Sequence, residues 1–389
     1  ESAEQIKSVS DAPVIMIGGH VAALPARTLI EEPIDYACNG EGPLTVERLL
    51  AGDELIMVPG LVWRDDVTIR NNMPAPLSTM ESLHGDIWDL LPMHLYRAHN
   101  WQCLDGSSRH GYASIHTSLS CPFACSFCMI DAPFRASKAR QYRTRQPDAV
   151  VSEIRMLHKN YGVRNIKISD EMFILKPSHY LPICEGLAAL PFADELNIWA
   201  YARIDTVKPD TLSLLRSAGI RWLALGIESA STHVRDGAFK HLNDQDIRET
   251  VKAIQDAGIN VIGNFIYGLS DDTAESMQAT LDLALDLNCE FSNHYSCMPY
   301  PGSRLFDETH SEDLPDSWSG YSQHSYDCRP LPTAMLTSAD VLRFRDQAFM
   351  DYFTDERYLE SIERKFGPSA VAEIKRMTAN QLPRKLLDT

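Results

Sequence analysis

Short apolar runs alternate with amphipathic segments between residues 112 and 298, and this alternation constrains the fold more than any other feature of the chain. Each run has the length and composition of a buried strand and is followed by a helix-forming stretch. Repeated strand–helix units indicate a parallel sheet with helices outside it. Six units, two fewer than a closed eight-unit barrel has, predict an α/β fold with a partial (β/α)6 TIM-like barrel. The six predicted strands are Tyr112–Ser118, Val163–Ser169, Leu196–Ala202, Ile220–Ile227, Ile259–Tyr267 and Glu290–Met298.

Two helices of the barrel are especially clear in the sequence. Val150, Ile154 and Leu157 recur at helical spacing after Pro147, which suits the first turn of a helix. A second helix, over Asp246–Ala257, ends at a glycine. Since ligands of such barrels bind where the strands end, we expect the functional residues directly after each strand.

The segments around the barrel give three further domain assignments. Residues 1–52 read as strand, glycine turn, helix, strand and helix, which indicates the second half of a doubly wound domain. Because the chain enters this pattern midway and lacks an initiator methionine, we expect an additional N-terminal part in the natural protein. Residues 53–111 are expected to be a linker and strap with a small hairpin at Leu61–Arg70, residues 112–306 the barrel, and residues 307–389 a C-terminal helical cap.

Charge and hydropathy narrow the function classes. The formal net charge of −17 argues against binding to a nucleic-acid backbone, which needs clustered Lys and Arg, so a small-molecule substrate is expected. No stretch reaches the roughly 18 consecutive apolar residues of a membrane span, and Glu1–Ser10 has no signal-peptide pattern. We therefore expect a cytoplasmic protein.

Three of the nine cysteines fall within eight residues, directly after the first predicted strand: Cys121, Cys125 and Cys128. Thiolates are soft ligands that suit iron–sulfur clusters or zinc, and structural zinc sites almost always have a fourth Cys or His. No fourth ligand follows at the usual zinc spacing. A [4Fe–4S] cluster on three thiolates leaves one iron open to chelate a small molecule through an amine and a carboxylate. The alternatives are a zinc knuckle that uses His116 or a distant cysteine, and a four-thiolate electron-transfer cluster.

The Cys-x-x-x-Cys-x-x-Cys loop after the first strand of a six-unit barrel resembles the radical S-adenosylmethionine superfamily, and the resemblance extends from residue 112 to about 306. It implies a [4Fe–4S] cluster on Cys121, Cys125 and Cys128, and reductive cleavage of S-adenosylmethionine to a 5′-deoxyadenosyl radical. It also implies a flavodoxin- or ferredoxin-type electron donor. Phe127 matches the aromatic residue that packs on the adenine in that family.

The resemblance assigns further cofactor contacts to the strand ends. Asp170 and Glu171 are both candidates for the carboxylate that binds the methionine amino group, and Arg203 matches the arginine that binds the methionine carboxylate. Glu228 resembles the acid that meets the ribose or the methionyl group.

Two glycine motifs of the same family follow strands five and six. Tyr267 and Gly268 are similar to the motif beside the adenine, although Ser270 stands where a proline is usual. Tyr300-Pro301-Gly302-Ser303 matches the family's backbone-contact motif.

The N-terminal segment resembles the second half of the cobalamin-binding domain that precedes the barrel in one subfamily. Gly18, Gly19, His20 and Glu41 are its candidate cobalamin contacts, since glycines allow close approach of the backbone to a nucleotide tail. The histidine motif that lies upstream in such domains is absent from this chain, so the lower ligand of the cobalt is not identified.

The resemblance implies a cobalamin-dependent radical methyltransferase acting on a small metabolite, a lipid or a sugar precursor. A second hypothesis keeps the same cofactors but replaces methyl transfer by ring formation or oxidation, as in the anaerobic cyclases of the family. A third is a binding module in which metal only stabilises the cysteine loop. The sequence identifies no substrate and no substrate base.

Overall fold

The computed structural model describes residues 2–83, 87–134, 142–242 and 244–388, and the chain divides into two compact units. Unit 1 comprises Glu1–Leu83, Ser120–Arg143 and Pro299–Glu312, and unit 2 comprises His84–Leu119, Thr144–Met298 and Asp313–Thr389. This division differs from the expected barrel domain of residues 112–306. The cysteine loop and the segment after the sixth barrel strand belong with the N-terminal residues, because their contacts are made there.

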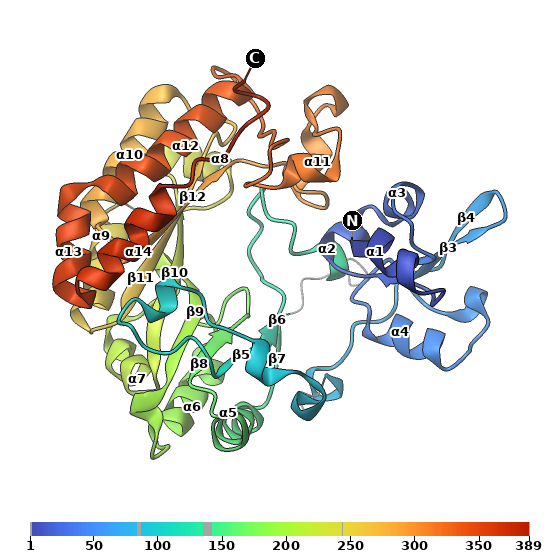
Figure 1. Cartoon of the computed structure of the whole chain (residues 1–389), viewed down its shortest axis with the longest axis horizontal. Helices are drawn as coiled ribbons and strands as arrows, with labels where there is room; N and C mark the ends of the chain where they lie inside the picture. The colour runs from blue at the N-terminus through green and yellow to red at the C-terminus, as the bar shows by residue number, and fades with distance from the viewer. Residues whose placement is uncertain (1, 84–86, 135–141, 243, 389) are drawn as a thin grey trace. The chain divides into compact units, whose positions relative to one another are not determined.

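Unit 2 contains a six-stranded parallel sheet in the order β12-β11-β10-β9-β8-β5, which confirms the partial barrel (Figure 1). Every predicted strand is present, and most begin or end within two residues of the predicted bounds. The strands are β5 (Tyr112–Ile115), β8 (Asn165–Ile168), β9 (Asn197–Arg203), β10 (Ile220–Glu228), β11 (Asn260–Tyr267) and β12 (Phe291–Ser296).

Helices cover the outer face of this curved sheet (Figure 1). Pro147 begins α5, which ends at Gly162, a residue in the left-handed region with φ 64°. Thr273 and Ser276 form a capping box at the start of α10. The apolar faces of these helices and the outward side chains of the strands form one continuous core. The helices are α5 (Pro147–Tyr161), α6 (Pro177–Ala188), α7 (Leu212–Ser217), α8 (Thr232–Gly237), α9 (Asp244–Asp256) and α10 (Ala274–Leu287).

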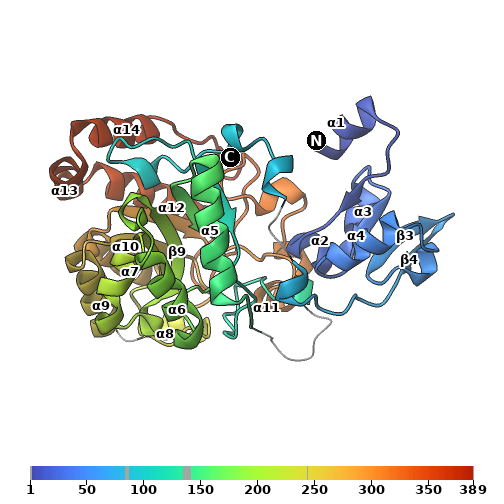
Figure 2. The ribbon, with the colours of Figure 1, turned by 90° about the horizontal axis from the view of Figure 1, so that it is seen from below.

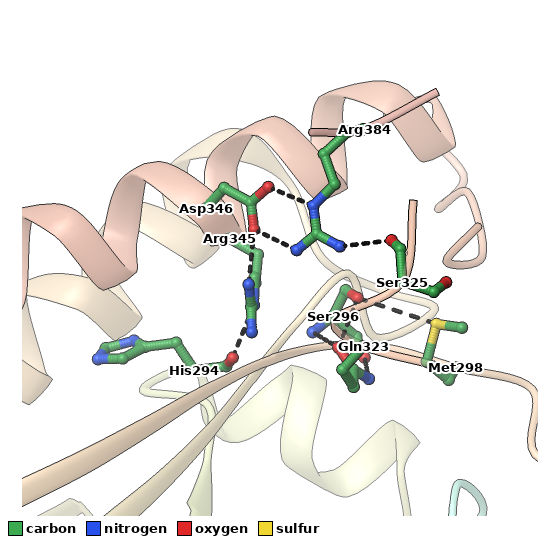
Figure 3. A network of polar contacts seen from close by, with 8 residues as sticks. All are labelled: His294, Ser296, Met298, Gln323, Ser325, Arg345, Asp346 and Arg384. Carbon is green, nitrogen blue, oxygen red and sulfur yellow. Dashed lines mark hydrogen bonds and ion pairs between the residues drawn. The ribbon is translucent and has the colours of Figure 1, made fainter. Parts of the chain in front are cut away.

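The C-terminal helices predicted from the sequence are α12 (Ser338–Thr354), α13 (Glu356–Phe366) and α14 (Pro368–Thr378). Arg345 of α12 donates a hydrogen bond from Nε to the carbonyl oxygen of His294 in β12, 2.8 Å away (Figure 3). Arg384 binds Asp346 with two nitrogens and the carbonyl of Ser325 with a third, each at 2.9 Å. These buried arginines fix the cap and the chain's last segment to the edge of the sheet.

Unit 1 is built around a four-stranded sheet, β1-β2-β3-β4. Helices α3 and α4 lie beside it (Figure 2). Strands β1 and β2 are parallel, as a doubly wound fragment requires, and β2, β3 and β4 are antiparallel. The elements are α1 (Ser2–Val9), β1 (Ile15–Met16), α2 (Gly19–Ala23), α3 (Pro25–Glu31), β2 (Tyr36–Cys38), α4 (Pro43–Leu50), β3 (Leu61–Asp65), β4 (Thr68–Asn71) and α11 (Arg304–Glu308).

The hairpin expected at Leu61–Arg70 is β3–β4, but it is part of the N-terminal sheet and not of a linker. Trp63 pairs with Tyr36, and Leu61 and Val62 are fully buried. The turn residues around the hairpin predict where it ends, but they carry no information about the strand that pairs with it. The expected domain boundary between residues 52 and 53 therefore falls inside unit 1. Two-residue strands, β6 (Ser118–Leu119) and β7 (Arg143–Thr144), flank the cysteine loop. None of the described helices is long and apolar enough to cross a membrane.

Candidate functional site

The three cysteines lie on a loop of unit 1. Its backbone turns through a 3.1 Å hydrogen bond from the amide of Cys128 to the carbonyl of Cys125. Ser120, immediately ahead of Cys121, has φ 73°, a conformation that costs a non-glycine residue free energy and is typical of functional loops. The amide of Leu305 donates to the carbonyl of Ser126 at 2.9 Å. This bond joins the cysteine loop to the segment that follows the Tyr300–Ser303 motif.

The thiol environment fits ligands of a cluster. Loss of water around the sulfur, followed by the neighbouring thiols of Cys125 and Cys121, raises the pKa of Cys128 to about 12, although the residue as a whole is exposed. Bound iron would supply the positive charge that stabilises the three thiolates. Among the described residues, no three Cys, His, Asp or Glu side chains are arranged around a single ion. A cubane needs a different arrangement, because each thiolate binds its own iron.

The glycine turn of the N-terminal segment lies against this loop within unit 1. Helix α2 packs on the short helix at Ala132–Phe134. A Cβ atom added to Gly19 would come within 2.6 Å of Met129 Cε, the flexible end of that side chain, so the backbone of Gly19 lies close against Met129. Gly18 has φ 133° and open space where a Cβ would be. His20 is half-buried, and burial followed by the charge of Arg27 lowers its pKa.

Glu41 makes internal contacts that the sequence did not reveal. Its carboxylate accepts hydrogen bonds from the guanidinium of Arg143 and from the amide of Ser78, the latter at 2.8 Å. The side chains of Arg143 and Glu41 are 12% and 9% exposed. Glu41 therefore joins three segments of unit 1, and its contact with cobalamin stays a prediction.

Asp170, at the end of β8 in unit 2, is fully buried. Its carboxylate accepts hydrogen bonds from the amide of Thr117 at 2.6 Å, from the hydroxyl of Thr117, and from the hydroxyl of Ser118 at 2.6 Å. Nε2 of His179 lies 3.0 Å from the Thr117 hydroxyl. Asp170 thus holds the residues that lead into the cysteine loop. Glu171 is half-buried, and the choice between the two carboxylates as ligand of a cofactor ammonium stays a prediction.

Arg203 lies at the end of β9, and its guanidinium is paired with a neighbouring carboxylate. Nε and Nη2 donate to the two carboxylate oxygens of Asp205 at 3.0 and 3.1 Å. The Arg203 side chain is 8% exposed, whereas that of Asp205 is 44% exposed. Asp205 therefore orients the planar guanidinium from the solvent side.

Glu228, the last residue of β10, forms a buried ion pair with Lys240. The backbone of Glu228 has φ 67°, and the register between β10 and β11 shifts between Gly226 and Glu228. A Cβ atom on Gly226 would overlap both Lys240 Nζ and Glu228 Oε1. Because Gly226 has no side chain, it leaves room for the strained Glu228 and for Lys240.

We expect Gly226→Ala to destabilise unit 2 by about 1–3 kcal/mol, because the added methyl group separates a buried ion pair. Urea-induced unfolding measures the change. The matched control adds Gly226→Ala to Lys240→Met and is compared with Lys240→Met alone, where one of the two polar atoms that the methyl group would meet is gone and the added cost should be smaller. Equal costs in both backgrounds would show that the ion pair is not what the glycine accommodates.

Tyr267 is fully buried, and its side chain faces the core of unit 2. The phenol lies 2.9 Å from Nδ1 of His294, and the two rings stack. Gly268 has φ 82°, donates its amide to Asp272 at 2.9 Å, and has no room for a Cβ against Val341. Any cofactor contact of Tyr267 must therefore come from its backbone.

The sequence alone missed the partners of these residues. Thr117, Lys240, Arg143 and His294 each hold a candidate residue in place, and none belongs to a motif. Lys240 is an ordinary cation in the sequence, and only the fold brings it to Glu228. The strongest missed signal was Thr117-Ser118, a pair of hydroxyls directly ahead of a ligand loop.

A partial barrel whose first strand leads into a three-cysteine loop defines the chain as a cluster-binding α/β enzyme. Residues 115–284 match the family model described as the radical SAM superfamily, where SAM is S-adenosylmethionine. The chain therefore contains a radical SAM domain over these residues. Such a domain implies a [4Fe–4S] cluster and S-adenosylmethionine as cofactors.

Two curated relatives cover most of this chain. An uncharacterized methyltransferase of Pyrococcus horikoshii is 29% identical over 320 residues, which are 79% of this chain and 65% of that protein. The anaerobic magnesium-protoporphyrin IX monomethyl ester cyclase of Rubrivivax gelatinosus is 31% identical over 316 residues, 78% of this chain and 54% of that protein. The chain therefore spans about half to two thirds of the length of these relatives.

Solved structures share the fold. The radical S-adenosylmethionine methyltransferase TsrM of Kitasatospora setae, with cobalamin and a [4Fe–4S] cluster bound, matches with a TM-score of 0.59 at 19% identity. The match covers 78% of this chain and 58% of TsrM. The cobalamin-dependent radical enzyme OxsB matches with a TM-score of 0.54, over 70% of this chain and 38% of OxsB.

Proposed function

We propose that this chain is the catalytic part of a cobalamin-dependent radical S-adenosylmethionine methyltransferase that acts on a small organic substrate in the cytoplasm. A flavodoxin- or ferredoxin-type protein would supply the electron. The relative named as a methyltransferase and the fold shared with TsrM support methyl transfer. A reducing compartment suits a chain whose nine cysteines form no disulfide among the described residues.

One observation carries the assignment to the cobalamin-dependent group. The turn at Gly18-Gly19 packs directly on the segment after Cys128, through the contact between Gly19 and Met129. Both segments belong to unit 1, so a cofactor held by the glycines and a cluster held by the cysteines would share one compact body. That adjacency is what a radical methyltransferase requires, because the methyl donor and the radical source must reach the same substrate carbon.

The residues of this chain have distinct tasks in the proposal. Cys121, Cys125 and Cys128 hold the cluster, and Phe127 lies beside the adenine. Glu171 and Arg203 bind the ammonium and carboxylate of the cosubstrate, with Asp205 orienting Arg203. Glu228 contributes a carboxylate at the rim, and Gly268 a backbone surface. Gly18, Gly19 and His20 would approach cobalamin, and Glu41 would fix the loop around them.

The cofactors, when bound, supply one-electron cleavage and a transferable methyl group. The protein's contribution is to orient the cosubstrate and to exclude water from a reactive radical. The buried Asp170, Glu228 and Arg203 serve this purpose, because they fix strand ends at which the cosubstrate would bind.

Product analysis under anaerobic conditions tests the function. We expect the reconstituted full-length protein, given dithionite, S-adenosylmethionine, methylcobalamin and candidate substrates, to form both 5′-deoxyadenosine and S-adenosylhomocysteine. Radical cleavage accounts for the first product and remethylation of cobalamin for the second. Omission of methylcobalamin is the matched control and should abolish S-adenosylhomocysteine. If neither product forms, the proposed function is wrong.

A second function is favoured by the 31% identity to an anaerobic cyclase. In that reaction class the substrate radical would close a ring or be oxidised, and no methyl group would be transferred. The same assay separates the two functions, since a cyclase forms 5′-deoxyadenosine without S-adenosylhomocysteine.

A further inference from the structure

The inner face of the barrel in unit 2 carries a half-buried lysine, Lys167, beside buried tryptophan rings, and the proposed cofactor contacts do not use these side chains. Side chains alternate along a strand, and the helices cover one face of this sheet (Figure 1). The register aligns Lys167 with Trp199, and Trp199 with Trp222, so the three side chains share the inner face. Tyr201 follows on the same face of β9 and is half-buried.

Aromatic rings gather on this inner face near the amino-terminal ends of the strands. Trp101 lies on the short helix Trp101–Cys103, which precedes β5. Its ring centroid is 5.2 Å from that of Trp199, 5.3 Å from Trp222 and 5.9 Å from Phe291. His99 stacks on Trp101 at 5.2 Å. We call these five residues the aromatic floor.

Lys167 stands next to the aromatic floor without a carboxylate partner among the described residues. Its Nζ lies 4.9 Å from the centroid of the Trp199 ring. Burial lowers the pKa of Lys167. His99 and His116 are its titratable neighbours, and burial lowers the pKa of each, which favours the neutral imidazole; neither form of an imidazole carries a negative charge.

The inward positions of β8 and β9 that precede the strand-end residues carry no negative charge. The inward positions of β8 and of β9 before Arg203 hold Asn165, Lys167, Asn197, Trp199 and Tyr201. Of the carboxylates at the strand ends, Glu228 is paired with Lys240, and Asp170 accepts hydrogen bonds from Thr117 and Ser118. An ammonium that is partly removed from water gains from an aromatic face but still lacks a counter-charge. Such an arrangement is typical of a site whose counter-ion arrives with a ligand.

We propose that Lys167 binds an anionic substituent of the substrate, a carboxylate, sulfonate or phosphate, while the aromatic floor receives the apolar part of the molecule. The inference rests on the proposed function, because it takes the barrel interior as the substrate pocket. Lys167 lies within β8, ahead of the strand-end residues Asp170 and Glu171, so it belongs to the interior and not to the cosubstrate rim.

Calorimetric titration of the full chain with two naphthalene probes isolates the charge. Naphthalene-1-sulfonate and naphthalene-1-sulfonamide share an apolar body and differ in charge. We expect the sulfonate to bind about tenfold more tightly, the gain from one charge-assisted contact. Lys167→Met should remove the preference and Lys167→Arg should retain it. Lys252→Met, at an exposed lysine paired with Asp256, is the matched control and should leave the preference unchanged.

The inference is overturned if the wild type shows no preference for the sulfonate, or if Lys167→Met keeps it. If the preference is lost in Lys167→Met, comparison of 1-naphthoate with 1-naphthyl phosphate then identifies the substituent that the site prefers. The titration requires no turnover, so this inference can fail while S-adenosylmethionine cleavage succeeds. Conversely, absence of cleavage would refute the proposed function without changing the titration.

Discussion

Replacing Cys128 by alanine is expected to lower the iron content of the anaerobically reconstituted protein from about four atoms per chain to below about one, and to reduce S-adenosylmethionine cleavage to the background without enzyme. A cubane held by three thiolates has no spare protein ligand, so the loss of one sulfur leaves two irons exposed. Cys121→Ala and Cys125→Ala should behave alike. Iron and sulfide analysis and the yield of 5′-deoxyadenosine measure the effect.

The matched control for this series is Cys184→Ala. Cys184 is fully buried in α6, and burial raises its pKa to about 12, so it is a core residue and not a ligand. Its replacement removes a small apolar group and should leave iron content and cleavage unchanged. Retention of full cleavage in any of the three loop variants would contradict the ligand assignment.

Replacing Asp170 by alanine is expected to destabilise the protein by about 3–5 kcal/mol, because three donors lose a fully buried acceptor. Glu171→Gln should change the stability by less than about 1 kcal/mol and instead weaken S-adenosylmethionine binding about tenfold. Urea-induced unfolding and a binding titration, carried out on both variants, separate a positioning carboxylate from a ligand.

The reverse result for Asp170→Ala would assign the two carboxylates differently. If Asp170→Ala unfolds like the wild type and loses cosubstrate binding, then Asp170 is the ammonium ligand and its hydrogen bonds to Thr117 and Ser118 are secondary. Asp170→Asn refines the result. It keeps the volume but turns an amide donor toward donor groups, so a stability loss close to that of alanine would identify the negative charge as the essential feature.

The barrel could be predicted because its signals are local. Parallel strands covered on one face by helices require long apolar runs, and helix ends such as Pro147 and Gly162 are encoded in the residues themselves. The observed strands are sometimes shorter than predicted, as β8 is, since apolar residues such as Val163 extend the run beyond the paired residues. Local patterns predict that a strand exists better than where it ends.

The composition of the two units could not be predicted in the same way. Trp63 pairs with Tyr36, and Gly19 packs on Met129, across separations that no local pattern encodes. The contacts within the candidate site could not be predicted either. The cysteines were identified from their spacing, but the partners of Asp170, Glu41 and Glu228 depend on tertiary contacts. The sequence therefore identified the candidate residues, and the structure showed which of them are held by internal contacts, whereas their contacts with cofactors stay predictions.

The central claim is that one iron of the cluster is open to the cosubstrate. Electron–nuclear double resonance of the reduced protein, with S-adenosylmethionine carrying ¹⁵N in its amino group, tests this directly. The account predicts a resolved coupling between the cluster spin and the amino nitrogen, which is lost when S-adenosylmethionine is omitted. A fully formed cluster that shows no such coupling while the cosubstrate is bound would contradict it.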